Sequence, residues 1–389
     1  MRILPHRFRA ALRSSALCSL ALGAALLGGA SARGSDRPDQ VFVLDRTGEY
    51  KTVACEVQTD GLDEVAVKLR GSNKTYAAAK VNRIVYGTVP ASYRDAQSYL
   101  LRGDLDNALR QWRLAADDAE ARQPVRASAR FEAALVLMKS GAKDTAANSF
   151  DAAISEFDRF LADFPTSRLV PRARGLSARA KLIAGQAQAS GELGAAVFDE
   201  LDASDKNAYT AELCLKTGLD AARAFLAAGD SASAEALYHK IQTKLTSILA
   251  EAPPESREML ERYSQRVVLG EGWRMLAENK AGQAATYFQG KLRTGLPDGL
   301  IDNARLGYAE GLFGQKKYRE AQLEFAAVSS LAATSRDDVA QALVGLARCA
   351  QNLPDSDSAE RTKSWLESCL TQYGDTPAAR MARELAANL

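Results

Sequence analysis

One spaced pattern of small and large residues constrains the fold of this chain more than any other feature. Its first copy has intervals of three, four, five, four and three residues, at Ala96, Tyr99, Gly103, Ala108, Trp112 and Ala115. A small and a bulky residue three positions apart share one face of a helix, and Gly103 can end that helix. Ala108 and Trp112 then begin the inner face of a second helix. The pattern therefore predicts a helical hairpin whose two helices meet at a seam of small and large side chains.

The same pattern recurs along the chain, and recurrence predicts a stack of similar units. The further copies are Ala134, Leu137, Gly141, Ala146, Phe150, Ala153; Ala222, Phe225, Gly229, Ala234, Tyr238, Ile241; Gly272, Met275, Asn279, Ala284, Phe288, Lys291; and Ala309, Leu312, Lys316, Ala321, Phe325, Val328. Asn279 and Lys316 replace the turn glycine. A weaker copy has Ala184, Ala187, Gly191 and Ala196. A last hairpin, 339–349 with 357–370, and a closing helix over 377–387 complete the predicted stack.

These units resemble the tetratricopeptide repeat family, most clearly in Gly103-Asp104-Leu105-Asp106-Asn107-Ala108 and Lys317-Tyr318-Arg319-Glu320-Ala321. The family's usual period is about 34 residues. The turn residues here are 38, 88, 50 and 37 apart, so longer helices, loops or another hairpin must fill the surplus. The resemblance implies a mainly α fold, an α-solenoid of helical hairpins over residues 90–389.

A second resemblance concerns two segments that look like helix junctions. They are Phe160-Leu161-Ala162-Asp163-Phe164-Pro165-Thr166-Ser167 and Cys369-Leu370-Thr371-Gln372-Tyr373-Gly374-Asp375-Thr376-Pro377. They are similar to junctions in tetratricopeptide proteins of the bacterial cell envelope, such as the outer-membrane barrel-assembly lipoprotein and the division coordinator of the Tol-Pal system. Those relatives are scaffolds, so the resemblance implies an envelope protein that binds protein partners.

The N-terminus has the form of a secretory signal peptide, which we assign to residues 1–32. Four arginines precede an apolar and small-residue run over 14–30, without any acidic residue. Ala30-Ser31-Ala32 fits a cleavage site, so we expect export to the periplasm, with secretion or an uncleaved anchor as alternatives. Without the four leader arginines, 50 − 4 = 46 basic residues face 48 acidic ones. This balance, without charge runs, argues against nucleic-acid or polybasic membrane binding.

Between a short linker at 33–40 and the helices, residues 41–89 alternate in period two, as Val65, Val67 and Leu69 illustrate. Five short strands are predicted, over 41–44, 50–59, 64–69, 75–79 and 81–86. Glycine-containing turns at Gly48, Gly61 and Gly71 separate the first four. In strand number and spacing the module weakly resembles small SH3-like or Sm-like barrels. Such barrels serve many functions, so the resemblance implies no activity.

The sequence offers no set of residues for catalysis. His239 is the one histidine beyond the leader, and the motifs of common hydrolases, metal sites and phosphate loops are absent. The fragment Gly270-Glu271-Gly272-Trp273 falls inside a predicted helix and follows no strand. We therefore predict a protein that is not an enzyme, with no catalytic, cofactor-binding or metal-binding residues.

Four cysteines lie beyond the leader, namely Cys55, Cys214, Cys349 and Cys369. Cys349 and Cys369 are the only close pair and could form a disulfide in an exported protein. Unpaired buried thiols are the alternative.

The tetratricopeptide resemblance also implies a binding surface, because the first helix of each hairpin lines the concave face. Projecting its positions gives the partner-binding candidates Tyr93, Phe131, Arg223, Trp273, Glu310 and Phe313. We predict a scaffold that holds a protein or peptide partner in the envelope. A chaperone for outer-membrane polypeptides is the alternative function. A tightly wound stack that buries these side chains is the alternative structure.

Overall fold

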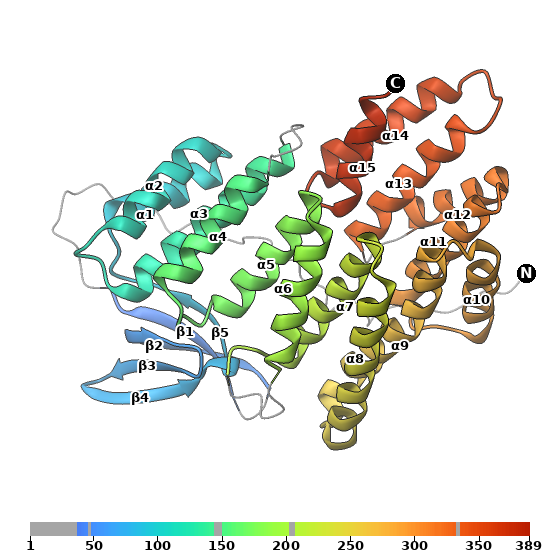
Figure 1. The fold of residues 1–389 in the computed structure, drawn as a ribbon. Helices are drawn as coiled ribbons and strands as arrows, with labels where there is room; N and C mark the ends of the chain where they lie inside the picture. The colour runs from blue at the N-terminus through green and yellow to red at the C-terminus, as the bar shows by residue number, and fades with distance from the viewer. Residues whose placement is uncertain (1–36, 46–47, 144–149, 202–206, 332–334) are drawn as a thin grey trace, which may run out of the picture. The chain divides into compact units, whose positions relative to one another are not determined.

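A computed structural model describes residues 37–45, 48–143, 150–201, 207–331 and 335–389. Over these residues the chain forms an antiparallel sheet followed by fifteen helices (Figure 1). The fold is mainly α, and the strands precede the helices as the sequence predicts. The predicted signal peptide lies outside the described residues. Within them, no helix combines the length and the apolar character needed to cross a membrane.

The sheet contains the five predicted strands. They are β1 (Asp39–Leu44), β2 (Tyr50–Asp60), β3 (Glu64–Leu69), β4 (Ser72–Ala77) and β5 (Val81–Val85), with a 3-10 helix over Ala78–Lys80 before β5. β1 starts inside the predicted linker. The strand order is β4-β3-β2-β1-β5. Val41 of β1 stands opposite Val53 of β2 and Ile84 of β5.

The sheet is open, which refines the expected barrel. In the described residues β4 pairs with β3 and β5 pairs with β1, but β4 and β5 do not pair with each other. The register shifts between Val57 and Thr59 where β2 passes from β1 to β3. Such a bulge bends the strand and increases its twist. The sheet thus has two free edges, one at β4 and one at β5.

The helices follow one another as hairpins. They are α1 (Ala91–Leu101), α2 (Leu105–Asp117), α3 (Gln123–Lys143), α4 (Asp151–Asp163), α5 (Val170–Ile183), α6 (Ala187–Asp199), α7 (Ala211–Ala227), α8 (Ser231–Glu251), α9 (Pro254–Ala277), α10 (Ala281–Thr294), α11 (Asp298–Gly314), α12 (Tyr318–Leu331), α13 (Arg336–Gln351), α14 (Ser358–Tyr373) and α15 (Pro377–Ala386). Odd-numbered helices up to α13 are the first helices of their hairpins.

Four predicted turn residues have the left-handed backbone that their place requires. Gly103 and Gly229 have φ values of 76° and 80°, and Asn279 and Lys316 have 60° and 64°. After Gly103, the side chain of Asp104 accepts a hydrogen bond from the N–H of Asn107 and caps α2. The sequence pattern therefore located these four hairpin turns correctly.

Two other predicted turns are wrong. Gly141 lies buried inside α3, which continues to Lys143, and Ala146 of that copy falls outside the described residues. In the weaker copy the hairpin exists, but its turn is at Gly185, with φ 87°. Gly191 lies in α6, where a Cβ would approach the ring of Phe225 within 2.6 Å. A glycine needed for close packing was thus mistaken for one needed by a turn.

Lys316→Gly is expected to raise the free energy of unfolding by up to about 1 kcal/mol. A non-glycine residue with left-handed φ costs roughly 1–2 kcal/mol, and glycine removes that cost while adding some flexibility to the unfolded chain. Denaturant titration followed by circular dichroism would measure the change. The matched variant Gly229→Ala should lower the same free energy; stabilisation by both variants, or by neither, would contradict this explanation.

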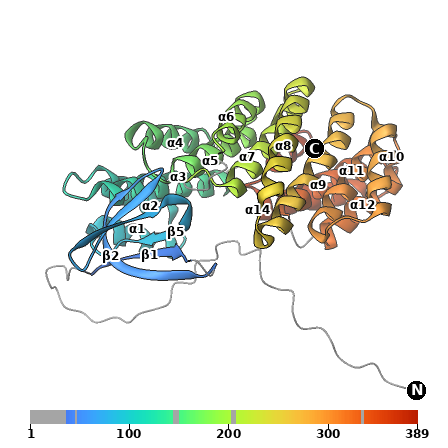
Figure 2. The same ribbon diagram turned by 90° about the horizontal axis from the view of Figure 1, so that it is seen from below.

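The first helices form the inner layer of the stack. α5 packs on α7, α7 on α9, α9 on α11 and α11 on α13, in addition to the contacts within each hairpin. The last helices also return to the early ones, since α14 contacts α3 and α15 contacts α5 (Figures 1 and 2). At that return Arg179 of α5 makes two hydrogen bonds to the Asp337 carboxylate of α13, of 2.9 and 2.7 Å. The inner layer is therefore closed by contacts between distant hairpins.

The sheet shares its core with the first helices. Val41, Val57 and Val67 belong to one buried cluster with Tyr93 of α1 and Trp112 of α2. One compact unit contains the sheet and all the described helices. The sheet and the helices therefore share one core, and surfaces formed by both can be described together.

Candidate binding cleft between the sheet and the inner helices

Two of the predicted binding residues are buried in the seams between helices. The Tyr93 ring packs edge-on against Trp112 with centroids 4.6 Å apart, and its hydroxyl lies 3.1 Å from the Ser128 hydroxyl oxygen. Phe131 packs against Phe157 of α4 and is only 2% exposed. These two aromatic rings contribute mainly to packing.

Arg223 and Trp273 meet one another on the inner layer. The Arg223 guanidinium lies over the Trp273 ring, 4.5 Å from its centroid. The Trp273 indole N–H donates to the Asn303 side-chain oxygen at 3.1 Å, and Asn303 donates to Asp338 at 3.0 Å. Asp338 is nearly buried and also lies 3.9 Å from Arg223. Side chains of α7, α9, α11 and α13 thus fill this region and satisfy each other.

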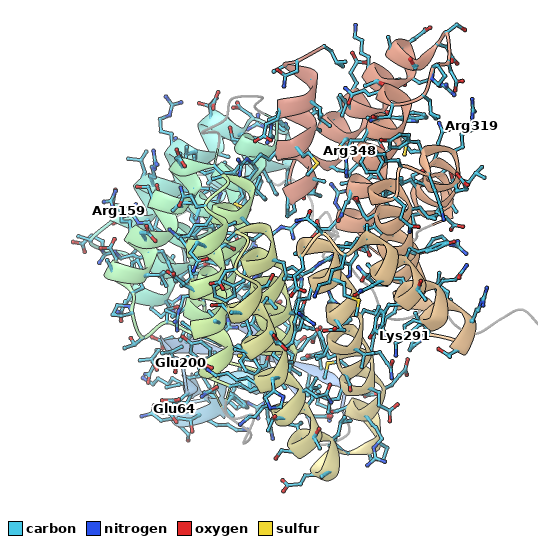
Figure 3. All side chains as sticks on the ribbon, turned by 45° about the vertical axis from the view of Figure 1, so that its right-hand side comes forward. Glu64, Arg159, Glu200, Lys291, Arg319 and Arg348 are labelled. Atoms are coloured by element: carbon cyan, nitrogen blue, oxygen red, sulfur yellow. The ribbon has the colours of Figure 1, made fainter. Side chains whose placement is uncertain are left out.

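Glu310 and Phe313 are similarly engaged by α13. Arg348 forms a 3.0 Å ion pair with Glu310 and lies 4.0 Å from the centroid of the Phe313 ring. Figure 3 shows Arg348 among the helices, whereas Arg159 and Arg319 lie at the outer margins. The inner layer at α7 to α13 is therefore held by polar and cation–π contacts. It follows the tightly packed alternative more closely than the apolar groove that the projected positions predicted.

A cleft of about 330 Å³ lies where the sheet meets the inner helices. β5 lines one side, and α3, the α4–α5 connection, α5 and the start of α7 line the other. Its walls include Asn82, Arg83, Ile84, Glu132, Arg168 and Arg172, together with the predicted residue Phe131. Of the six predicted binding residues, Phe131 is the one that reaches this cleft.

Arg168 fixes the floor of the cleft. Its Nε donates to the Asp60 carboxylate at 2.7 Å, and its Nη1 donates to the carbonyl of Val81 at 3.2 Å. The backbone N–H of Arg168 also donates to the carbonyl of Asp60 at 3.0 Å. Because both side chains of this pair are largely buried, the ion pair ties the sheet to the α4–α5 connection.

A second buried carboxylate secures the sheet next to the start of α3. The side chain of Asp39, 2% exposed, accepts hydrogen bonds from the N–H groups of Val57 and Gly87 at 2.8 Å. Two nitrogens of Arg122 also donate to it, each at 2.8 Å. Burial acts to raise the pKa of Asp39, but the hydrogen bonds from Arg122 and the two N–H groups bring it below its ordinary value.

The remaining charges of the cleft are not paired with one another by contact. Arg172 lies over the Phe131 ring at 5.4 Å and Arg83 lies over the Phe42 ring at 4.4 Å, neither with a carboxylate partner among the described residues. Burial raises the pKa of Glu132, and the more distant charges of Arg172 and Lys139 oppose that rise. Binding groups are therefore available in this cleft.

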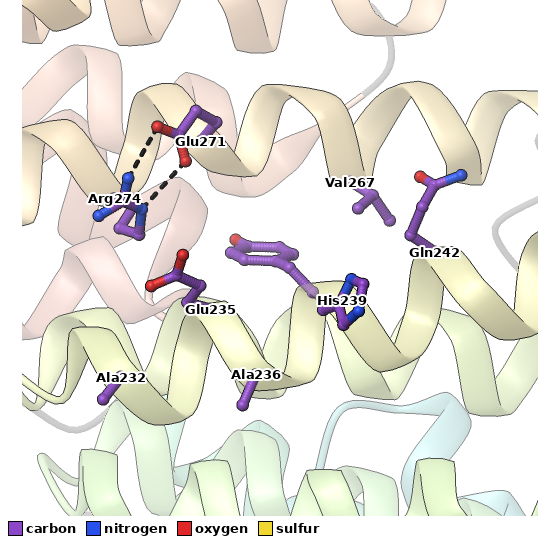
Figure 4. A pocket seen from close by; sticks show the side chains of 9 residues that line it. Ala232, Glu235, Ala236, His239, Gln242, Val267, Glu271 and Arg274 are labelled. Carbon is purple, nitrogen blue, oxygen red and sulfur yellow. Dashed lines mark hydrogen bonds and ion pairs between the residues drawn. The ribbon is translucent and has the colours of Figure 1, made fainter.

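A larger groove of about 610 Å³ lies between α8 and α9 on the other part of the chain (Figure 4). His239 lines this groove and is exposed. Arg274 forms ion pairs with Glu271 and Glu278. Burial raises the pKa of the neighbouring Tyr238 to about 12. The one arginine of this groove is thus already paired with neighbouring glutamates.

The predicted cysteine pair is not bonded. Cys349 and Cys369 are both buried free thiols, and the Cys369 sulfur lies 3.7 Å from the carbonyl of Ala340. Ala340 and Cys349 are nine positions apart on α13, about 13 Å along the helix axis. The spacing in the sequence correctly predicted that the two cysteines lie on facing helices. It could not predict whether they lie at the same level along the helix axes. No group of three or more potential metal ligands occurs in the described part of the chain.

Comparisons with known proteins bear on the fold alone. No protein-family model and no curated protein matches the sequence. A solved tetratricopeptide repeat protein from Parabacteroides merdae is 12% identical; the match covers 77% of this chain and all of that one, with a TM-score of 0.48. A circular tandem repeat protein is 16% identical over 77% of this chain and 65% of its own, with a TM-score of 0.18.

Proposed function

We propose that this chain is an exported, non-catalytic scaffold of the cell envelope, and that it binds a polypeptide partner in the cleft between β5 and the inner helices. The N-terminal segment supports export, and the helical repeat architecture, a class of fold that commonly binds polypeptides, supports binding. The single observation that carries the proposal is the cleft itself. The cleft combines an open strand edge with two arginines that have no carboxylate partner by contact, Arg83 and Arg172, within about 330 Å³.

Site-specific photo-crosslinking would test binding at this surface. A photoreactive phenylalanine analogue at the exposed position Asn82 should capture a discrete envelope partner in cells that express the full chain. The same analogue at Leu323, 71% exposed on α12, is the matched control and should not capture it. Capture of the same species at both positions, or at neither, would contradict the proposal.

Export has a separate test. We expect the protein recovered from the periplasm to begin at Arg33, because cleavage is predicted after Ala32. N-terminal sequencing would show this directly, and an unprocessed chain in the cytoplasm would contradict it. The chaperone alternative remains a prediction. Among the residues that the structure describes, the exposed large apolar side chains are few and scattered, such as Leu114 on α2 and Leu323 on α12.

A further inference from the structure

We propose that the partner enters the cleft as an extended segment that pairs with the free edge of β5 and directs acidic side chains to Arg83 and Arg172. This inference rests on the proposed function, because it specifies the form and charge of the polypeptide that the scaffold binds. The backbone of β5 would supply affinity, and the two arginines would select the segment.

The cleft follows the edge of β5 rather than one face of the sheet. The consecutive residues from Val81 to Ile84 all line it. Asn82 is a bulge residue in this run, because the register shifts between Phe42 and Val43 of β1; Arg168 in the cleft wall donates to the carbonyl of Val81, so the cleft reaches the backbone edge of β5. β5 pairs with β1 on one side only. Apart from the Val81 carbonyl, which Arg168 already occupies, its other side therefore presents backbone N–H and C=O groups that an added strand can use.

The two free edges of the sheet differ in their surroundings. β4 is open to solvent from Ser72 to Thr75 and carries Lys74, a residue type that protects edges from pairing. β5 instead lies across the cleft from α3 and α5, which contribute Glu132 and Arg172 to the same walls. A segment added to β5 would be covered by these helices, whereas one added to β4 would stay exposed. The structure thus favours β5 as the docking edge.

The charges of the cleft favour an acidic segment. Asp60 and Arg168 neutralise one another in their 2.7 Å pair. Arg83 and Arg172 then share the cleft walls with one further carboxylate, Glu132, whose burial raises its pKa and opposes its negative charge. A guanidinium binds carboxylates through paired N–H donors, and a positive surface selects a negative partner. The bound segment should therefore carry glutamate or aspartate at alternate positions. Alternate side chains of an extended segment lie on the same face, and that face would contact the two arginines.

Fluorescence anisotropy with defined peptides would test this proposal on the full mature chain. The probe is a labelled eight-residue peptide of alternating valine and glutamate. A second peptide has lysine for each glutamate, and a third has the glutamates but an N-methyl group on every backbone nitrogen. We expect binding of the first peptide alone, because the second reverses the charge and the third cannot donate to β5. Equal binding of the lysine or the N-methyl peptide, or no binding of the first, would overturn the proposal.

Matched variants on the two edges localise the binding. Arg83→Glu should weaken binding of the glutamate peptide by about tenfold or more, and Lys74→Glu, the same charge change on β4, should leave it within about twofold. Both side chains are exposed, so both variants should keep the circular dichroism spectrum and melting temperature. Glu132→Gln should tighten binding. An equal loss in both edge variants would show a general charge effect and would overturn the proposal.

The two proposals can fail separately. If the crosslinker at Asn82 captures a partner but the glutamate peptide does not bind, the scaffold function stands and the acidic added strand is wrong. If that position captures nothing and the peptide still binds through Arg83, the cleft recognises strands but the envelope partner is wrong.

Discussion

Replacing Asp39 with alanine is expected to lower the free energy of unfolding by about 3–5 kcal/mol, a large fraction of the stability of most domains. The Asp39 carboxylate is almost fully buried and accepts four hydrogen bonds, two from Arg122 and one each from the N–H groups of Val57 and Gly87. Its removal leaves these donors without an acceptor and leaves the arginine's charge uncompensated. The sheet would lose its attachment to the helices at this end.

Urea titration of the full mature chain, followed by far-ultraviolet circular dichroism, would measure the change in the unfolding free energy. Asp158→Ala is the matched control, because Asp158 is an exposed aspartate on α4 and should change that energy by less than about 0.5 kcal/mol. Similar losses in the two variants would show that the buried hydrogen bonds of Asp39 have no special weight.

The same residue predicts acid sensitivity. Its pKa in the folded chain lies below the ordinary value of 3.8, so the unfolded chain binds this proton more readily. The stabilisation is therefore fully present above about pH 4 and is lost as the pH falls through the lowered pKa. Asp39→Asn should flatten the dependence of the unfolding free energy on pH below about 4. If the unfolding free energy of this variant depended on pH as steeply as that of the unchanged chain, Asp39 would not be the source of the acid sensitivity.

Phe288→Ala is expected to cost about 3–5 kcal/mol of unfolding free energy, because it would leave a cavity between α9, α10 and α11. The ring is fully buried, and its centroid lies 5.5 Å from that of Trp273. Gly272 and Gly307 allow the neighbouring helices to approach it: a Cβ at either position would lie 2.5 or 2.3 Å from the ring. Glycine at these sites brings helical backbone against an aromatic ring.

Denaturant titration again gives the unfolding free energy, and the exposed residue Leu323 supplies the control. Leu323→Ala removes a similar amount of apolar side chain from a surface position and should cost less than about 0.5 kcal/mol. In the reverse direction, Gly307→Ala should cost about 1–3 kcal/mol through overcrowding of the Phe288 ring. A cost below about 1 kcal/mol for Phe288→Ala would show that the surrounding helices collapse onto the vacated space.

Local chemistry explains which parts of this fold the sequence predicts. Gly103 and Gly229 mark turns because few residue types other than glycine adopt a left-handed backbone. Asparagine is one of these types, and Asn279 occupies the same position in its hairpin. Gly191 escaped correct interpretation because a glycine that makes room for Phe225 cannot be told from a turn glycine by spacing. The strands were readable from period two, yet closure of a sheet depends on contacts between its first and last strands, which no local pattern encodes.

The candidate site was harder to predict for the same reason. Arg83 lies on a strand and Arg172 on a helix, and the two reach one cleft only through the tertiary packing of the sheet. No sequence motif indicates that these two arginines lie near each other. Projection from the repeat pattern found Phe131 but also selected Arg223 and Trp273, which engage each other on the inner layer. The position of a residue along a helix predicts which face its side chain lies on. Whether that face is exposed or packed depends on hairpins that are distant in the sequence.

The bond between Arg179 and Asp337 has a consequence for how this architecture can change during evolution. In an open solenoid each unit contacts its neighbours alone, so a unit can be duplicated or deleted and the array only lengthens or shortens. Here residues 158 positions apart must meet, with α6 and three complete hairpins, α7–α8, α9–α10 and α11–α12, between their helices. One unit more or fewer would carry α13 past its place on α5. We therefore expect related chains that keep this ion pair to keep the same number of hairpins between these two helices.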